Sequence, residues 1–180
     1  SEKVGDLIFH FKAGEFFQNN PFVLPLLVEH VVQQSKTDEI SLLVDAYCGG
    51  GLFGLSAASR FKKIVGIEIS REGFEGARTN ARINQIDNAQ FFLGDASSIF
   101  DELKGISEPA ALVIDPPRRG CDPDFLRQAI EFGPQRIVYV SCEPATQARD
   151  SQILLEAGYQ PILAQPFDLF PQTRHVENVL

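Results

Sequence analysis

The sequence predicts an α/β fold in which an open, mostly parallel sheet is covered by helices on both faces. Apolar runs of strand length alternate with segments of helical periodicity, and several runs are apolar throughout, as expected for strands buried on both faces. The predicted strands are residues 41–46, 63–69, 89–94, 110–115, 135–141, 159–164 and 176–180. They make a seven-stranded, doubly wound, Rossmann-like sheet within a single domain, 1–180.

Helix signals fall between these strands. Ser70 is suited to cap one helix and Pro123 to open another. A third follows Pro144 and ends near Gly158, a residue that favours the left-handed conformation after a helix end. A fourth, upstream of the first strand, is indicated by the helical spacing of Leu24, Leu27, Val28 and Val31.

Composition narrows the class of protein. No apolar run approaches the ~20 residues that span a bilayer, and the start of the chain does not resemble a signal peptide, so we expect a soluble intracellular protein. The three cysteines are isolated, without a C-x-x-C pair. They therefore favour free thiols over disulfides, and no metal site is expected.

The charge is awkward for an enzyme that acts on nucleic acid. The formal net charge is -8, whereas affinity for phosphates comes mainly from lysine and arginine. The chain begins at Ser1 and contains no methionine, which suggests a piece of a longer protein. We also expect the protein to be a monomer. We expect RNA-binding parts outside residues 1–180 if the substrate is RNA.

A glycine-rich loop follows the first predicted strand, in D-A-Y-C-G-G-G-L-F-G. Gly49 and Gly51 allow the backbone to turn sharply and approach a ligand, and Tyr47 lies at the same strand end. A tight turn without any ligand is the alternative. Further support comes from Glu68, which ends the second strand where nucleotide-binding folds place an acid for ribose hydroxyls.

Asp95 follows the third strand in G-D-A. It either faces the adenine edge of a bound nucleoside or caps the helix that starts at Ala96. The glycine loop lacks both the G-x-G-x-x-G spacing and a G-K-[ST] ending, which argues against dinucleotides and nucleoside triphosphates. A nucleoside ligand without phosphates, S-adenosyl-L-methionine, is the expected cofactor.

Two further strand ends carry candidates for chemistry. Asp115 precedes two prolines in V-I-D-P-P-R-R-G, which form a rigid shelf, or else a stiff loop with a local cap. Arg118 stands where amino-methyltransferases have an aromatic residue, which argues against exocyclic-amine chemistry. Cys142 follows the fifth strand in S-C-E-P-A-T, and position alone favours a small buried apolar residue over a reactive thiol.

The chain resembles the RNA uracil-C5 methyltransferase family over almost its whole length. The motifs F-F-Q-N-N, D-A-Y-C-G-G-G, D-P-P-R-R-G, S-C-E-P-A-T and F-P-Q-T-R-H-V-E-N-V occur in the family's order, and D-L-F-P-Q-T is most similar to fungal and animal tRNA members. The resemblance implies a class I S-adenosylmethionine-dependent methyltransferase fold. It also implies Cys142 as nucleophile, Glu177 as base, and a cofactor site formed by Gln18, Tyr47, Glu68, Asp95 and Asp115.

Two positions depart from the family pattern. Glu143 stands where the family usually has asparagine after the nucleophile, and Leu52 stands where some members have asparagine near the glycine loop. The first puts the hydrogen bonding of the substrate pocket in question, and the second leaves one cofactor contact unassigned.

The reaction that the resemblance implies needs these residue types. Uracil C5 becomes nucleophilic only after a thiolate adds to C6, and the C5 hydrogen must leave as a proton before the thiolate departs. The T-loop uridine of tRNA is the favoured target and ribosomal RNA the alternative. Two rivals remain: a DNA cytosine-C5 methyltransferase, which predicts Cys121 as nucleophile, and an inactive cofactor-binding RNA-interaction module.

Overall fold

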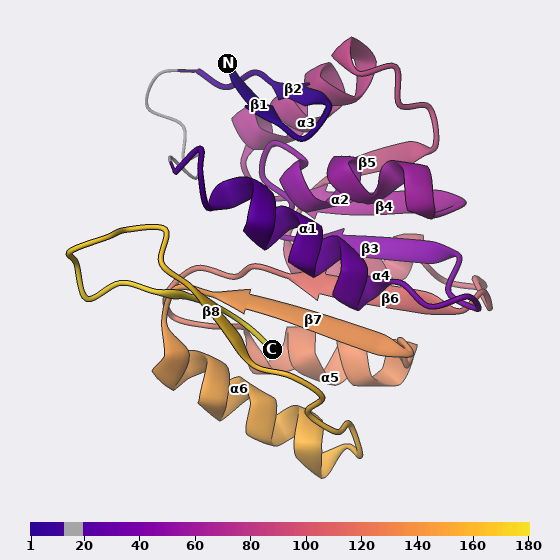
Figure 1. Ribbon diagram of the computed structural model, residues 1–180. Coiled ribbons are helices and arrows are strands. Elements are labelled where there is room, and N and C mark those ends of the chain that lie inside the picture. The colour runs from indigo at the N-terminus through magenta and orange to yellow at the C-terminus, as the bar shows by residue number, and fades with distance from the viewer. Residues whose placement is uncertain (13–19) are drawn as a thin grey trace.

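The computed structural model describes residues 1–12 and 20–180 and contains a seven-stranded sheet (Figure 1). The strands are β3 (Leu42–Ala46), β4 (Lys63–Glu68), β5 (Ala89–Leu93), β6 (Ala110–Ile114), β7 (Arg136–Ser141), β8 (Gln165–Phe167) and β9 (Glu177–Val179). Their order is β5-β4-β3-β6-β7-β9-β8. The first five of these are mutually parallel, and β9 runs antiparallel to both of its neighbours, β7 and β8. The predicted mostly parallel sheet is confirmed.

Helices cover both faces of this sheet (Figure 1). In the described part of the chain they are α1 (Leu24–Ser35), α2 (Leu52–Ala57), α3 (Arg71–Ile83), α4 (Ile99–Glu102), α5 (Pro123–Phe132) and α6 (Pro144–Glu156), with 3-10 turns η1 (Ala58–Arg60) and η2 (Ala96–Ser98). None of the described helices is both long and apolar enough to cross a membrane.

Two apolar cores lie on opposite faces of the sheet. Because side chains alternate along a strand, Leu43 of β3 packs with α1 and α2, whereas its neighbours Leu42 and Val44 pack with α4 and α5. β3 and β6 are buried at every position. This two-sided burial explains why their sequences are continuous apolar runs rather than alternating ones.

The predicted helix boundaries are confirmed by their caps. The Ser70 hydroxyl accepts a hydrogen bond from Gly73 N, and Pro123 occupies the first turn of α5 behind the capping carboxylate of Asp122. At the end of α6, Gly158 has a φ of 98°, the left-handed conformation that glycine adopts without strain.

The predicted strand 159–164 is wrong, because the strand in this region is β8, which begins at Gln165. β8 pairs with β9 from Gln165, opposite Val179, to Phe167, opposite Glu177. Residues 159–163 belong to no ladder among the described residues, and Ile162 is 73% exposed.

An N-terminal hairpin that the sequence analysis missed comprises β1 (Glu2–Val4) and β2 (Leu7–Phe9). Two asparagines at the end of α3 hold the segment: Asn80 lies in the helix and Asn84 is its C-cap residue. Asn84 exchanges two hydrogen bonds with the main chain of Ile8, at 2.9 and 2.8 Å, and Asn80 exchanges two with His10, at 2.8 and 3.2 Å. These hydrogen bonds fix the N-terminal segment against the last turns of α3.

Candidate active site

The candidate active site is a cleft of about 720 Å³ at the carboxyl edge of the parallel strands. We call it the carboxyl-edge cleft. The predicted residues that line it are Tyr47, Gly49, Glu68, Asp115, Cys142 and Glu177. Ligands of open α/β sheets bind at this edge because the strand order reverses there. The fold thus brings most of the predicted site residues to one cleft, whereas Gln18 lies outside the described residues.

The glycine loop forms one wall of the carboxyl-edge cleft. Gly49 N donates to Glu68 Oε2 at 2.8 Å, and Ser70 N donates to the other carboxylate oxygen at 2.7 Å. Glu68 therefore holds the loop and the start of α3 together. Each oxygen retains a second acceptor position, and the side chain lines the cleft, so Glu68 can still accept hydrogen bonds from a ligand.

Gly51 has a structural reason for being glycine. Its φ is 85°, and a Cβ there would lie 2.9 Å from Leu55 Cδ1. The residue precedes α2 and is not part of the cleft lining. Tyr47 also has a positive φ, 63°, and its ring meets Phe125 edge-on at 5.4 Å. Packing against α5 holds this side chain at the cleft in a backbone conformation that non-glycine residues rarely adopt.

Asp95 caps η2, because its carboxylate accepts hydrogen bonds from Ser97 N at 3.0 Å and from the Ser97 hydroxyl at 2.7 Å. These bonds lower the pKa of Asp95. The capping alternative is thus confirmed, and the side chain is not part of the cleft lining. Its contact with an adenine edge stays a prediction.

Cys142 and Glu177 come to the cleft from the adjacent antiparallel strands β7 and β9. The last pair of the β7–β9 ladder is Ser141 with Asn178, and Cys142 and Glu177 are the next residues along the two strands. The charge of Glu177 acts on the Cys142 thiol. Glu177 is 1% exposed, and both side chains line the carboxyl-edge cleft. The two candidates for nucleophile and base are therefore neighbours.

Carboxyl groups cluster around this pair. Burial, followed by the nearby charges of Glu177 and Asp45, raises the pKa of Asp115 well above its usual value. Asp45 in β3 is fully buried. Its Oδ2 accepts from Gly54 N at 2.8 Å, whereas Oδ1 has no hydrogen-bond partner among the described residues, and burial raises the pKa of Asp45 to about 7. The sequence analysis missed Asp45, although a carboxylate inside the apolar strand L-L-V-D-A is a signal of a special role.

The thiol of Cys142 has charged neighbours of both signs. Burial and then Glu177 raise its pKa, the Arg118 guanidinium hydrogen-bonded to the thiol lowers it, and Asp115 raises it further. Arg118 lines the cleft. Arg149 instead pairs with Asp150 at 2.6 Å. The departure Glu143 is not among the groups that shift the Cys142 pKa, and its main-chain N donates to the Ser141 hydroxyl at 3.1 Å.

Cys121, the nucleophile expected for a DNA cytosine-C5 methyltransferase, lies in the apolar core on the α5 face of the sheet. It is 4% exposed, and burial raises its pKa to about 12. It is absent from the described lining of the carboxyl-edge cleft. Its burial in the core, outside the described lining of the cleft, argues against Cys121 as the nucleophile and so against that rival.

Two residues of the cleft, His10 and Phe11, come from the N-terminal segment that the sequence analysis left unassigned. The side-chain hydrogen bonds between Asn80 and the main chain of His10 hold them at the site. Asn80 Nδ2 also donates to Gly50 O at 3.0 Å. Asn80 is 1% exposed, so this side chain joins the N-terminal segment, the glycine loop and α3. Pairing between residues 70 positions apart leaves no local sequence signal.

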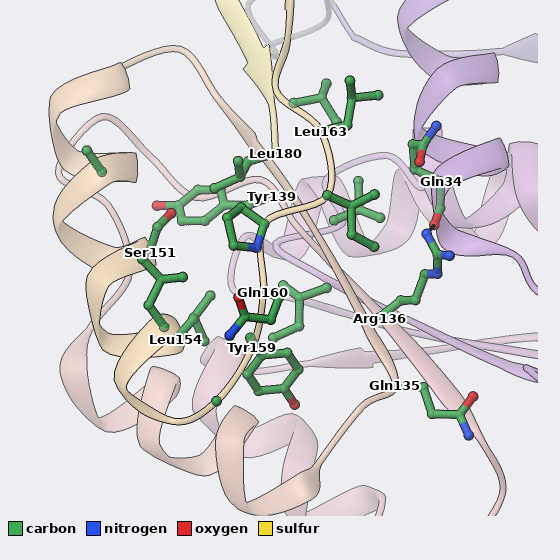
Figure 2. Close-up of a pocket in the computed structure, with 18 of the residues that line it drawn as sticks. Gln34, Gln135, Arg136, Tyr139, Ser151, Leu154, Tyr159, Gln160, Leu163 and Leu180 are labelled. Atoms are coloured by element: carbon green, nitrogen blue, oxygen red, sulfur yellow. Dashed lines mark hydrogen bonds between the residues drawn. The ribbon is translucent and has the colours of Figure 1, made fainter.

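A second hollow of about 640 Å³, the outer groove, lies between α6, β7 and residues 159–163. Figure 2 shows Ser151 and Leu154 on one side, Gln34 on the other, and Tyr159 beside them. Its lining contains no aspartate, glutamate or cysteine. Two of its hydroxyls are engaged: Tyr139 Oη donates to Asp150, and Tyr159 Oη donates to Pro134 O at 3.0 Å. His30 Nε2 and Ser151 Oγ are buried in its wall without a hydrogen-bond partner among the described residues. Among those residues the outer groove therefore offers mainly apolar surface, with neither a carboxylate nor a thiol.

The fold and the carboxyl-edge cleft define a class I S-adenosylmethionine-dependent methyltransferase domain. The crystal structure of M. jannaschii TYW2 in complex with AdoMet superposes with a TM-score of 0.66 at 18% identity. The match covers 98% of this chain and 81% of that one. At this identity the likeness concerns the fold alone. The family model for tRNA (Uracil-5-)-methyltransferase matches residues 3–180, and the chain belongs to that family.

Named relatives of the chain are consistent with this family assignment. The Schizosaccharomyces pombe tRNA (uracil(54)-C(5))-methyltransferase is 43% identical over 190 residues, covering 99% of this chain and 36% of the relative. The Pyrococcus abyssi tRNA (uracil-54, C5)-methyltransferase, solved in complex with S-adenosyl-L-homocysteine, gives a TM-score of 0.85 at 31% identity, over 99% of this chain and 42% of that one. The chain thus spans about two-fifths of the length of these proteins.

Proposed function

We propose that this domain catalyses S-adenosylmethionine-dependent methylation of uracil C5 in RNA, with the T-loop uridine of tRNA as target. The observation that carries the proposal is that Cys142 and Glu177 line the same cleft as Glu68 and the glycine loop. The substrate follows the names of the relatives from yeast and archaea. Ribosomal RNA is the alternative target.

The residues of the carboxyl-edge cleft fit the cofactor. A volume of about 720 Å³ lies in the range of small-molecule sites. Glu68 offers carboxylate oxygens to ribose hydroxyls, Gly49 and Gly50 expose main chain, and Leu52, Phe53 and Ile69 supply apolar surface. When bound there, the cofactor supplies an electrophilic methyl group.

Cys142 begins the reaction on the base. Its thiolate adds to uracil C6, forming an Sγ–C6 bond and moving the electron pair of the C5–C6 double bond toward C5 and O4, which makes C5 nucleophilic. A thiol with a raised pKa holds little thiolate at neutral pH, so Arg118, which lowers that pKa, favours the addition. The uridine must leave its stack to reach Cys142.

Glu177 completes the reaction as base. After C5 has gained the methyl group, Glu177 takes the C5 proton, the electron pair restores the C5–C6 double bond, and the Sγ–C6 bond breaks. Asp115 assists proton handling as a second carboxyl near Glu177: burial, and then the charge of Glu177, raise the pKa of Asp115 and favour its protonated form.

A mechanism-based adduct tests the proposal. Fluorine at C5 cannot leave as a cation, so tRNA containing 5-fluorouracil should trap the enzyme through its Sγ–C6 bond once the methyl group is transferred. We expect a covalent protein–RNA band on a denaturing gel that Cys142→Ala abolishes and Cys121→Ala retains. The longest form of the protein is the proper reagent, because this domain spans about two-fifths of its relatives.

The same experiment separates the alternatives. An adduct that survives Cys142→Ala would refute the assigned nucleophile. Cofactor binding without any adduct on tRNA, but with one on 5-fluorouracil-containing ribosomal RNA, would change the substrate. Cofactor binding without an adduct on either RNA would indicate a cofactor-binding RNA-interaction module.

A further inference from the structure

Helix α6 begins two residues after Cys142 and carries three polar side chains on the face that meets the loop after β6. They are Thr146, Arg149 and Asp150, whose spacing of three and four residues places them together on one side of a helix. The loop they meet comprises residues 116–121, the part of D-P-P-R-R-G-C that follows Asp115.

Each of the three side chains bonds the main chain of this loop. The Thr146 hydroxyl donates to Arg118 O at 3.1 Å, and Arg149 Nη2 donates to Arg119 O at 2.9 Å. Asp150 Oδ2 accepts from Cys121 N at 2.7 Å. Three main-chain groups within four residues are thereby tied to one helix face.

Asp150 is a firm anchor for the loop. It is 1% exposed, and besides Cys121 N it accepts from Tyr139 Oη at 2.7 Å and from Arg149 Nε at 2.8 Å. The loop approaches it so closely that Gly120, with a φ of 80°, has no room for a side chain: a Cβ would lie 2.5 Å from Asp150 Oδ2. The turn is closed by Gly120 N donating to Pro117 O at 2.8 Å.

The loop carries Arg118 to the cleft, and α6 begins at Pro144, two residues after Cys142. Arg118 and Cys142 both line the carboxyl-edge cleft, although they arrive on different strands, β6 and β7. The bonds from α6 connect these two parts directly. We propose that Thr146, Arg149 and Asp150 are positioning residues that hold the 116–121 loop so that the Arg118 guanidinium stays beside Cys142 Sγ.

The charges around Cys142 explain why this position matters. The titratable groups facing the thiol are Glu177 from β9, and Asp115 and Arg118 from the loop after β6. The two carboxyls raise the pKa of the thiol, and Arg118 lowers it. Movement of Arg118 would leave Cys142 facing carboxyls. The role of these hydrogen bonds in catalysis rests on the proposed function, but their effect on the pKa of the Cys142 thiol does not.

Alkylation of Cys142 measures the effect without RNA or cofactor. The rate of modification by iodoacetamide as a function of pH follows the thiolate fraction, and peptide mapping by mass spectrometry separates Cys142 from the buried Cys48 and Cys121. The variants are Thr146→Val, which removes the hydroxyl at nearly constant volume, and Thr146→Ser, which keeps it. Gln152→Ala, on an exposed position of α6, is the matched control.

We expect Thr146→Val combined with Arg149→Gln to shift the pH profile upward and to slow alkylation at pH 7.5 about threefold to tenfold, the change that a pKa rise of about half to one unit causes. Thr146→Ser and Gln152→Ala should match the wild type. In an Arg118→Gln background the same double substitution should have no further effect, because the positioning acts through Arg118.

Two results would overturn the positioning role: an unchanged alkylation profile in the folded double variant, or effects that add fully to those of Arg118→Gln. Circular dichroism establishes that the variant is folded, and Asp150→Asn, which retains one acceptor oxygen, provides a second substitution if it is not. A shifted alkylation profile in the double variant, together with no RNA adduct from the wild-type protein, would support the positioning role and refute the proposed function. The failure of one proposal can therefore be distinguished from the failure of the other.

Discussion

The carboxyl-edge cleft and the outer groove are hollows of similar size with opposite chemistry. The cleft, of about 720 Å³, gathers Glu68, Asp115, Cys142 and Glu177, whereas the groove, of about 640 Å³, has no acid and no thiol in its lining. The difference follows from the sheet: the cleft lies where the chain leaves several parallel strands, so residues from distant parts of the sequence converge there. Volume alone therefore does not identify a site, but convergence of titratable groups does.

The largest expected effect in this comparison comes from Glu177→Gln. Without a carboxylate to take the C5 proton, turnover should fall about 10²- to 10⁴-fold. The covalent adduct with ordinary uridine-containing RNA should then accumulate, because methyl transfer no longer leads to elimination. Turnover and adduct are measured with radiolabelled cofactor and denaturing gels. Turnover close to that of the wild type would remove Glu177 from the mechanism.

The buried Asp45 predicts a pH dependence of stability. Its pKa rises from 3.8 in the unfolded chain to about 7 in the fold, so folding binds a proton and the free energy of unfolding falls as the pH rises between these values. Asp45→Asn should flatten this fall and stabilise the protein at pH 8 by about 1 to 4 kcal/mol relative to wild type. Urea unfolding at pH 5 and pH 8 measures it, with the exposed Asp87→Asn as control. Equal slopes in all three proteins would mean that Asp45 is ionised at low pH.

Glu68→Gln tests the cofactor half of the cleft. The amide keeps one acceptor for the glycine loop but loses the charge-assisted hydrogen bonds to ribose hydroxyls. The binding free energy of S-adenosyl-L-homocysteine should therefore become less favourable by about 1.5 to 3 kcal/mol, which raises the Kd. Calorimetric titration measures it. Gln160→Ala, in the outer groove, is the control and should leave the Kd unchanged. Equal weakening by both would contradict the assignment of the cofactor to the cleft.

The smallest expected effect is that of Ile162→Ser in the outer groove. The side chain is 73% exposed, so its loss should change the free energy of unfolding by no more than about 0.5 kcal/mol. Cofactor affinity and Cys142 alkylation should not change. A large loss in either would show that the groove is coupled to the cleft and would break the comparison.

The strand predictions show which part of the fold is readable locally. Runs such as Leu42–Ala46 and Ala110–Ile114 are apolar because helices cover both faces, and this burial is written in the residues themselves. Residues 159–164 have comparable strand propensity but no ladder, because a strand also needs a partner. The partner is set by the register of β8 and β9, which local sequence does not encode.

The candidate site also contains residues that the sequence predicts and residues that it does not. Sequence motifs place Tyr47, Gly49, Glu68, Asp115 and Cys142 at strand ends, and the family resemblance adds Glu177. His10 and Asn80 had no local signal, since their contact joins residues 70 positions apart. Asp95 was ambiguous because the same aspartate can cap a helix or bind a ligand, and its bonds to Ser97 show the cap.

The sequence by itself determined the order of strands and helices, the helix caps and the family, because these depend on local periodicity, on single side chains and on short motifs. Only the tertiary structure decided that Cys142 and Glu177 line one cleft, that Cys121 is buried, and that α6 holds the loop carrying Arg118. These outcomes depend on strand register and helix packing between segments far apart in the chain. Side-chain chemistry is inherited from the residue, but its neighbours and its pKa are properties of the fold.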